Sequence, residues 1–370
     1  MQQIPKTMLA ATLFGPGDLR TITKPVPQPG PGEVLIRVEA CAICATDLLI
    51  LDHRLPGQPP FDGTFTPGHE YSGTIVSLGK GVDEFRVGDR AAVEVHKGCG
   101  RCENCIRGLY TACLNYGNLT KGHRANGLTV DGGFAQYVVA HINTVYRLPD
   151  HISFAEATLI TTAGTVLYGI DRLGGFLAGE TVAVTGPGPI GLMAVQLAKA
   201  LGARVLLTGT RESRLQVGRE VGADVTINVN ETNPVDEVRQ LTGGKGADVV
   251  LECSGAANAA QEAVEMVKKG GKILLAGFFK DPVTVDLSRL ISNNLVIYGA
   301  RGEGGRNVGR ALALMAQGRL QAKPLITHYF PLPEINRAIK TFAQRLEGAI
   351  KVIVEPQKGG KLEDGSQSGD

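Results

Sequence analysis

The stretch TVAVTGPGPIGLMAVQLAKALGA, residues Thr181–Ala203, decides the fold of the second half of this 370-residue chain. A short apolar run ends in a glycine-rich turn, and a longer stretch with the apolar spacing of a helix follows. Glycines in the order G-x-G-x-x-G between a strand and a helix allow a tight turn, the close approach of a pyrophosphate and close helix packing. The sequence therefore predicts a dinucleotide-binding turn, with an ordinary glycine-rich turn as the alternative; its residues are Gly186, Gly188, Pro189, Ile190 and Gly191.

The residues around this turn have the rhythm of an α/β domain. Short apolar strands alternate with helices from Thr181 to about Ile297. Strands are expected at 181–186, 204–209, 247–255, 271–278 and 294–300, and helices at 189–203, 212–223, 234–242 and 256–268. This alternation predicts a parallel sheet with helices on both faces.

The rest of the chain predicts a second, β-rich domain. Residues 8 to about 150 alternate apolar and polar positions between glycine-rich turns, as in EVLIRVEACAI (Glu33–Ile43). SFAE (Ser153–Glu156) is a capping box that predicts the start of a helix. Amphipathic helices at 306–317 and 333–344 and a strand at 349–356 complete the chain. We expect a β-rich domain of residues 1–153 and 299–356, a dinucleotide domain of 154–298 and a disordered tail of 357–370.

The composition is that of an ordinary globular protein. Hydrophobic residues make up 43% and charged residues 20%, and the net charge of +2 gives no reason to expect nucleic acid or an anionic membrane as partner. No apolar run is long enough to span a bilayer, and the N-terminal residues lack the apolar core of a signal peptide. We expect a cytoplasmic protein.

Four of the seven cysteines have the spacing C-x2-C-x2-C-x7-C, at Cys99, Cys102, Cys105 and Cys113. Clustered cysteines in a reducing compartment are more often metal ligands than disulfides, and four thiolates around one zinc ion make a closed, structural site. The spacing predicts such a zinc site, with a disulfide pair or free thiols as the alternative.

A second group of residue types suited to zinc lies in the β-rich part. Cys44 belongs to CAICATD (Cys41–Asp47), and His69 and Glu70 belong to PGHEYSG (Pro67–Gly73). Thr46 could place a hydroxyl beside a metal-bound oxygen. Each also has an ordinary explanation, because Cys44 could be a buried thiol and His69–Glu70 a packed turn. We expect Cys41, Cys253 and His53 to be structural.

The strand after the dinucleotide turn bears on the cofactor. An acidic residue at its end would bind the ribose 2′-hydroxyl of NAD, but RVLLTG ends in Gly209. Thr210, Arg211 and Arg214 follow, and arginine pairs well with a 2′-phosphate. The sequence favours NADP(H) over NAD(H); alternatively, both arginines are solvated helix residues and NAD is used.

The order of these motifs resembles the zinc-containing medium-chain dehydrogenases, which include alcohol, polyol and sugar dehydrogenases. The resemblance runs from Met8 to Pro356 and rests on CAICATD, PGHEYSG, VGDR, the four cysteines, GGFAQYVV and GPGPIG. It implies an α/β protein with a GroES-like catalytic domain, an inserted Rossmann domain and assembly as a homodimer or homotetramer. It implies structural zinc on the four cysteines, and catalytic zinc on Cys44 and His69 with Glu70 as an acidic neighbour. It also implies that Thr46 relays the substrate proton and that Lys351 lies near the cofactor pyrophosphate.

Two positions depart from the family pattern. The family usually supplies a third zinc ligand where this chain has Thr162, beside Thr161, and a neutral hydroxyl is a poor zinc ligand. Either Glu70 or water completes the site, or zinc is weakly held or absent. Many members also carry a histidine at the position of Leu49, which cannot relay a proton.

We therefore expect a zinc-dependent, NAD(P)-linked oxidoreductase that interconverts a small alcohol, polyol or sugar and its carbonyl by hydride transfer. The first alternative is an NADPH-dependent reductase of activated double bonds or quinones without catalytic zinc. The second is a catalytically silent dinucleotide-binding protein, for which Cys44, Thr46 and His69 would have no purpose.

Overall fold

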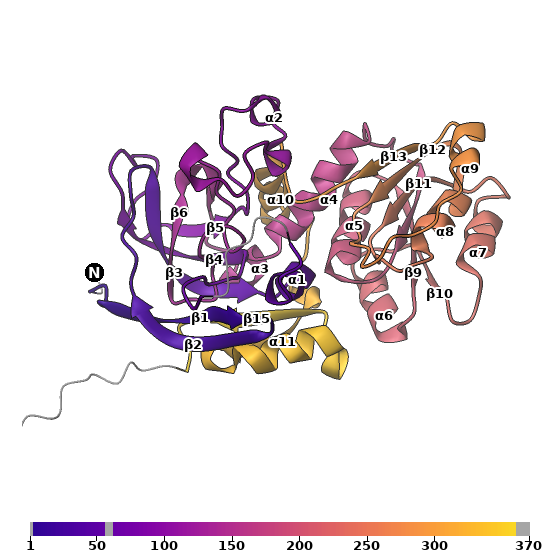
Figure 1. Ribbon diagram of the computed structural model, residues 1–370. Helices are drawn as coiled ribbons and strands as arrows, with labels where there is room; N and C mark the ends of the chain where they lie inside the picture. Colours follow the sequence, from indigo (N-terminus) through magenta and orange to yellow (C-terminus); the bar gives the residue numbers. More distant parts are fainter. Residues whose placement is uncertain (1–2, 56–61, 360–370) are drawn as a thin grey trace, which may run out of the picture. The chain divides into compact units, whose positions relative to one another are not determined.

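The computed structural model describes residues 3–55 and 62–359, which fall into two compact units. The first unit comprises residues 1–158 and 328–370, and the second comprises residues 159–327. Figure 1 shows the elements of both units in the order of the chain. No helix among the described residues is long and apolar enough to cross a membrane.

The first unit is built on a sheet in the order β14-β15-β3-β4-β5-β7, with β6 also paired to β3, and the pairs of β3, β4 and β5 are antiparallel. These strands are β3 (Glu33–Ala42), β4 (Glu70–Leu78), β5 (Arg90–Val93), β6 (Tyr137–His141), β7 (Val145–Arg147), β14 (Ile326–Pro331) and β15 (Lys351–Glu355). β1 (Thr7–Gly15) and β2 (Asp18–Pro25) form a separate antiparallel pair. The helices of this unit are α1 (Ala45–Leu51), α2 (Glu103–Ile106), α3 (Phe154–Ala157) and α11 (Ile335–Gln344).

Strand β3 is the centre of this unit. It pairs along its length with β4, while its other edge pairs first with β6 and then with β15. Its inward side chains, among them Val34, Ile36 and Val38, are completely buried. The alternating pattern of EVLIRVEACAI predicts a half-buried strand, but Leu35 on the opposite face is also completely buried, so β3 is covered on both faces there.

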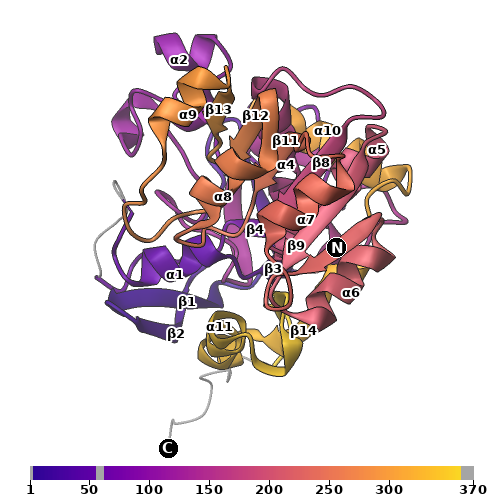
Figure 2. The ribbon, with the colours of Figure 1, turned by 90° about the vertical axis from the view of Figure 1, so that its right-hand side faces the viewer.

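The second unit is a doubly wound parallel sheet in the order β10-β9-β8-β11-β12-β13. Its strands are β8 (Thr181–Thr185), β9 (Arg204–Gly209), β10 (Val225–Asn228), β11 (Ala247–Glu252), β12 (Val267–Leu275) and β13 (Val296–Gly299). Its helices are α4 (Ile160–Arg172), α5 (Pro189–Ala200), α6 (Glu212–Glu220), α7 (Pro234–Leu241), α8 (Ala259–Met266), α9 (Leu287–Ser292) and α10 (Asn307–Ala316). Figure 1 shows α5 and α6 on one face of the sheet, and α7 and α8 cover the face turned to the viewer in Figure 2. The predicted α/β class with GroES-like and Rossmann parts is confirmed.

The units divide at different residues from those expected. Residues 299–327, expected in the β-rich domain, belong to the second unit because α10 packs on α4. A Cβ atom on Gly164 of α4 would lie 2.8 Å from the Val308 side chain of α10. The other boundary falls at Thr158, after α3, because the helix that starts at the Ser153 cap ends at Ala157 and a new one starts at Ile160.

The prediction that the disordered tail starts at residue 357 is wrong. Gln357 donates side-chain hydrogen bonds to the carbonyls of Val38 (2.9 Å) and Gln136 (2.8 Å). Residues 357–359 are therefore part of the first unit, and the rest of the predicted tail lies outside the described residues.

Candidate metal and cofactor sites

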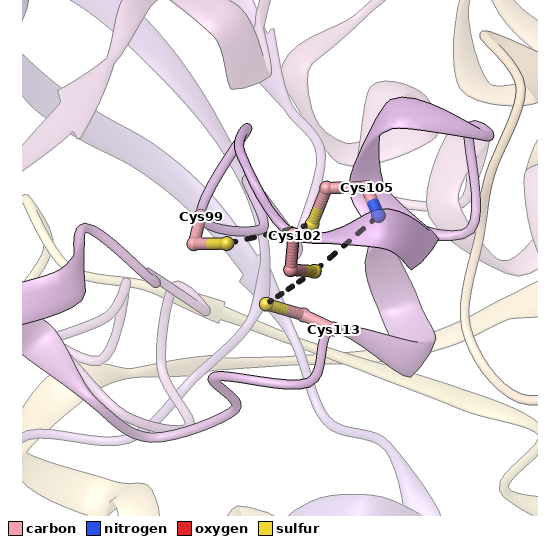
Figure 3. Close-up of side chains that lie close together, drawn as sticks. All are labelled: Cys99, Cys102, Cys105 and Cys113. Carbon is pink, nitrogen blue, oxygen red and sulfur yellow. Dashed lines mark hydrogen bonds between the residues drawn. The ribbon is translucent and has the colours of Figure 1, made fainter.

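The four clustered cysteines converge around one point (Figure 3). Their sulfur atoms all lie within 4.8 Å of one another, with Cys99 to Cys105 and Cys102 to Cys113 each at 3.9 Å. Zinc–sulfur bonds of about 2.3 Å in a tetrahedron place neighbouring sulfurs about 3.8 Å apart. The cysteines are free rather than disulfide-bonded. The geometry therefore fits a tetrahedral metal ion and not a disulfide pair.

The groups around these sulfurs act on them unequally. The Asn115 side-chain amide donates to Cys99 Sγ at 3.2 Å and, together with backbone hydrogen bonds of Arg101 and Cys102, lowers the pKa of Cys99 to about 5. Burial raises the pKa of Cys105 and of Cys113. The Cys105 backbone donates to Cys102 Sγ at 3.4 Å. Gly98 has a φ of 67°, and a Cβ there would lie 2.8 Å from Cys105 Sγ. Any other residue at 98 would press on Cys105 Sγ and on the Tyr110 side chain.

A second cluster forms at the start of two elements of the first unit. Cys44 caps α1, and His69 and Glu70 lie at the start of β4. One ligand atom from each lies within 4.8 Å of the others, and His69 and Glu70 are buried. A thiol, an imidazole and a carboxylate are the donor types that zinc prefers in proteins. Within the described residues, this cluster and the four-cysteine cluster are the two groups close enough to share a metal ion.

Asp47 supports the second cluster and was not assigned a role from the sequence. Its side chain is fully buried, accepts a hydrogen bond from the Cys44 backbone at 2.8 Å and contacts His69 Nδ1 at 3.1 Å. A carboxylate on one ring nitrogen fixes the orientation of a histidine ligand and leaves the other nitrogen for the metal. The signal available in the sequence was that Asp47, the last residue of CAICATD, is acidic and lies three positions after Cys44, the residue that caps the helix.

Burial by itself would lower the pKa of His69, but Asp47 and Cys44 raise it well above its usual value. The surroundings therefore favour positive charge at this point. A bound cation satisfies the same surroundings in place of the proton.

Lys351 lies beside the second cluster and forms a buried ion pair with Glu70. Burial would lower the pKa of Lys351, but Glu70 and Cys44 raise it above its usual value. Both partners are almost completely inaccessible, with side chains 1% and 4% exposed. The structure thus gives Lys351 a carboxylate partner, and its contact with a cofactor pyrophosphate stays a prediction.

Of the other residues expected at the catalytic centre, the structure places Thr46 beside the cluster and leaves the role of Thr162 untested. The Cys44 thiol lies 3.8 Å from the Thr46 hydroxyl, so Thr46 is at the cluster. Leu49 is buried on α1 and apolar, as expected. Thr161 and Thr162 are buried in α4, which belongs to the second unit. The role of Thr162 therefore stays a prediction.

The dinucleotide turn has the form that the glycine pattern predicts. Gly186 ends β8 with a φ of 83°, and a Cβ there would lie 2.7 Å from the Ser254 side chain. A Cβ on Gly191 would collide with the Gly186 carbonyl oxygen. A Cβ on Gly188 would meet no protein atom within 4 Å. Two glycines are thus needed for packing, while Gly188, which caps α5 before Pro189 and Ile190, borders open space suited to a ligand.

The end of β9 carries no carboxylate. A Cβ on Gly209 would lie 2.5 Å from the Pro187 ring. Thr210 and Arg211 are exposed, Arg214 is half-buried, and the Thr210 carbonyl accepts from Asn230 at 2.7 Å. The nearby Glu212 is paired with Arg219. The end of β9 thus has no acidic residue and is followed by Arg211 and Arg214, whose contact with a 2′-phosphate stays a prediction.

Glu252, at the end of β11, joins three strand ends and was also missed. One of its oxygens accepts from the Ser254 backbone (2.7 Å) and hydroxyl (2.6 Å), the Gly255 backbone (3.0 Å) and the Thr185 hydroxyl (3.2 Å). The other oxygen abuts Gly277, after β12, where a Cβ would collide with it. Thr185 precedes Gly186 directly, so the Glu252 carboxylate positions the loop that packs against the dinucleotide turn. An acidic residue in the apolar strand ADVVLE was the available signal.

Comparison with known proteins agrees with this arrangement. Residues 30–150 match the alcohol dehydrogenase GroES-like domain, and residues 189–317 match the zinc-binding dehydrogenase family. The sorbitol dehydrogenase of Halalkalibacterium halodurans is 35% identical over 94% of this chain and 98% of its own. This chain belongs to the zinc-containing medium-chain dehydrogenase family.

Members of this family with other names are also similar to the chain. The L-threonine 3-dehydrogenase of Pyrococcus furiosus is 38% identical over 82% of this chain and 86% of its own. The crystal structure of a zinc-binding dehydrogenase from Sinorhizobium meliloti, bound to NADP, is 30% identical. It covers 95% of this chain and all of its own, with a TM-score of 0.86. The chain is thus an oxidoreductase of this family, whose named members differ in substrate.

Replacing Asp47 tests its role in orienting His69. Asp47→Ala should weaken zinc binding at the second cluster by about 10–100-fold, because the imidazole loses its fixed orientation. The measurement is zinc per chain during dialysis against a graded chelator, with the four-cysteine site as internal reference. Asp52→Ala, on the exposed C-terminal cap of the same helix, is the matched control. Equal zinc retention by Asp47→Ala and wild type would contradict the assignment.

Replacing Glu252 tests the support of the dinucleotide turn. Glu252→Gln keeps the shape but turns charge-assisted hydrogen bonds into neutral ones, so the Kd for dinucleotide should rise about 5–10-fold. Titration calorimetry with NADP+ and with NAD+ measures the effect, and thermal unfolding monitors the fold. Glu220→Gln, on the exposed end of α6, is the control. A lowered Tm with unchanged Kd would show that Glu252 only stabilises the sheet.

Proposed function

We propose that this protein is a zinc-dependent, NADP(H)-linked oxidoreductase that interconverts a small polar alcohol and its carbonyl compound. The observation that carries the proposal is the convergence of Cys44, His69 and Glu70, with ligand atoms within 4.8 Å of one another. These residues come from two elements whose ends meet because Ala42 of β3 pairs with Glu70 of β4. Neither a purely structural zinc protein nor a dinucleotide-binding protein without activity needs this cluster.

The thiol, imidazole and carboxylate of this cluster fit zinc, and each of the surrounding residues has its own role. Zinc bound there would act as a Lewis acid that polarises the substrate oxygen. Cys44, His69 and Glu70 would hold it, and Asp47 would keep His69 in orientation. Glu70 is the proposed third protein ligand, because the hydroxyl of Thr162 is a much weaker donor.

Thr46 is the residue that would handle the substrate proton. A bound nicotinamide would supply the hydride acceptor, and the Thr46 hydroxyl would take the proton of the alcohol oxygen while releasing its own. Leu49 cannot accept the proton that Thr46 releases, so this proton must reach water by another route. The products are the carbonyl compound, the reduced dinucleotide and one proton.

Two observations support NADP(H) as the dinucleotide. The end of β9 offers Arg211 and Arg214 where an acidic residue would bind the ribose of NAD. The similar dehydrogenase from Sinorhizobium meliloti was solved with NADP. Arginine pairs with a phosphate in two parallel hydrogen bonds, which favours the 2′-phosphate.

The substrate class rests on the relatives and on composition. Sorbitol and L-threonine, named for two similar dehydrogenases, are both small polar molecules with hydroxyl groups. Aromatic residues make up only 5% of the chain, and it has no tryptophan. We therefore expect polyols and hydroxy amino acids to be better substrates than bulky aromatic alcohols.

Replacing Cys44 tests the proposed reaction. Cys44→Ser should reduce zinc from two ions per chain to one and lower alcohol oxidation at least about 100-fold, because the polarising metal is lost. The measurements are metal content and a panel of polyols, amino alcohols, ketones and enones. Cys41→Ser changes a buried cysteine outside both clusters and should keep two zinc ions and most of the activity.

Two results would overturn the proposal. An active Cys44→Ser enzyme would exclude a metal role for this thiol. One zinc per wild-type chain together with NADPH-dependent reduction of enones, and none of ketones, would instead establish the zinc-free reductase.

Replacing Arg211 tests the cofactor preference. Arg211→Ala should raise the KM for NADP(H) about tenfold or more and leave the KM for NAD(H) nearly unchanged, since only the phosphate loses a charged partner. Steady-state kinetics with both cofactors gives the ratio. Arg319→Ala, an exposed arginine after α10, is the control. Equal effects on both cofactors would refute a specific 2′-phosphate contact.

A further inference from the structure

A second pocket on the Rossmann unit is separate from the dinucleotide turn. It has a volume of 610 Å³, and its lining includes four cationic side chains, from Arg239, Lys245, Lys269 and Arg289. Asp286 is its one acidic residue and Val267 lies in its apolar part. Pockets of about 300–1,000 Å³ are the size that small-molecule ligands occupy.

The position of this pocket follows from the parallel sheet. Lys245 lies just before β11, and Val267 is the first residue of β12, so the pocket lies at the amino ends of the strands. Gly186 and Glu252 lie at the carboxyl ends. Since β11 has six residues and a parallel strand rises about 3.3 Å per residue, the two edges are roughly 20 Å apart. A ligand in this pocket would not overlap the dinucleotide phosphates.

Asp286 is the one carboxylate beside four cationic side chains in this pocket, so the lining keeps an excess of positive charge. The adjacent Lys268 forms an ion pair with Asp248, whereas no carboxylate among the described residues pairs with Lys245 or Lys269. Arg289 is half-buried, and its Nε is buried with no acceptor within the described part of the chain. A buried Nε–H without an acceptor is unfavourable, and an anion would supply the missing partner.

Cations at this edge of the sheet also have a simpler origin, because α7 and α8 end here and helix C-termini favour positive charge. That origin explains Arg239, which donates to the Glu265 carbonyl at 3.1 Å and 3.3 Å through two nitrogens. It also accounts for the position of Arg289, which lies in the last turn of α9. It does not account for Lys245 and Lys269, which do not lie on a helix. These two lysines, and the buried Nε of Arg289, therefore remain available to a ligand.

We propose that this pocket binds a small molecule with two or more phosphate groups. The guanidinium group of Arg289 can present donors to phosphate oxygens, while Lys245 and Lys269 add point charges. The volume exceeds what a single phosphate needs and leaves room for a sugar or short carbon chain against Val267. The proposal concerns a different edge of the sheet from the proposed active site and does not depend on the reaction.

The test is titration of the full-length protein with inorganic pyrophosphate and inorganic tripolyphosphate, followed by calorimetry. Lys245→Glu/Lys269→Glu should weaken binding at least about tenfold, because two attractions become repulsions. The control is Arg319→Glu/Lys323→Glu, which changes the net charge equally at exposed positions outside the pocket. Thermal unfolding of both variants monitors the fold.

Several results decide the matter. Loss of binding in the pocket variant, retention in the control and unchanged binding in Arg211→Ala would support the proposal. Loss in Arg211→Ala alone would place the anion at the dinucleotide site and overturn it. Equal weakening in the pocket variant and the control would show only nonspecific attraction, and binding to RNA or anionic vesicles but not to either probe would also overturn it.

Discussion

The ion pair between Lys351 and Glu70 joins residues 281 positions apart and lies beneath the second metal cluster. Its place is set by strand register, because Ala42 of β3 pairs with Glu70 of β4 on one edge and with Ile353 of β15 on the other. The same β3 end leads directly into Cys44. The return of the last strand to β3 thus completes the surroundings of the cluster. Removing one partner of such a buried pair commonly costs about 3–5 kcal/mol, since the other charge is left unpaired.

The charges gathered at this point favour a divalent cation. Asp47 and Glu70 are acidic residues, and Lys351 is the basic side chain paired with Glu70. Burial lowers the pKa of His69, but Asp47 and Cys44 raise it well above its usual value, so the surroundings favour positive charge there. A zinc ion bound by these residues would supply such charge. Asp47 would then both orient His69 and contribute to the attraction of the metal.

The features that could be predicted from the sequence are those in which nearby residues act together. The spacing of the four cysteines within 15 residues is enough to predict that their sulfur atoms converge, as they do. The spacing of the glycines at 186, 188 and 191 likewise predicts the tight turn that the structure has. The features that could not be predicted depend on contacts between distant segments. The pairing of Lys351 with Glu70, the hydrogen bonds of Gln357 to Val38 and the packing of α10 on α4 have no signal in local spacing. The role of Glu252 also depends on contacts with distant segments, so the sequence shows only that an apolar strand contains one acidic residue.

The absence of an acidic residue at the end of β9 is tied to the dinucleotide turn itself. Gly209 lies so close to Pro187 that a Cβ there would be 2.5 Å from the proline ring. Pro187 is the residue between the first two glycines of the turn. With proline at 187, a side chain of any kind at 209 would have to displace the glycine-rich turn. An acidic residue at 209 would therefore require a smaller residue at 187, so these two positions constrain each other through packing.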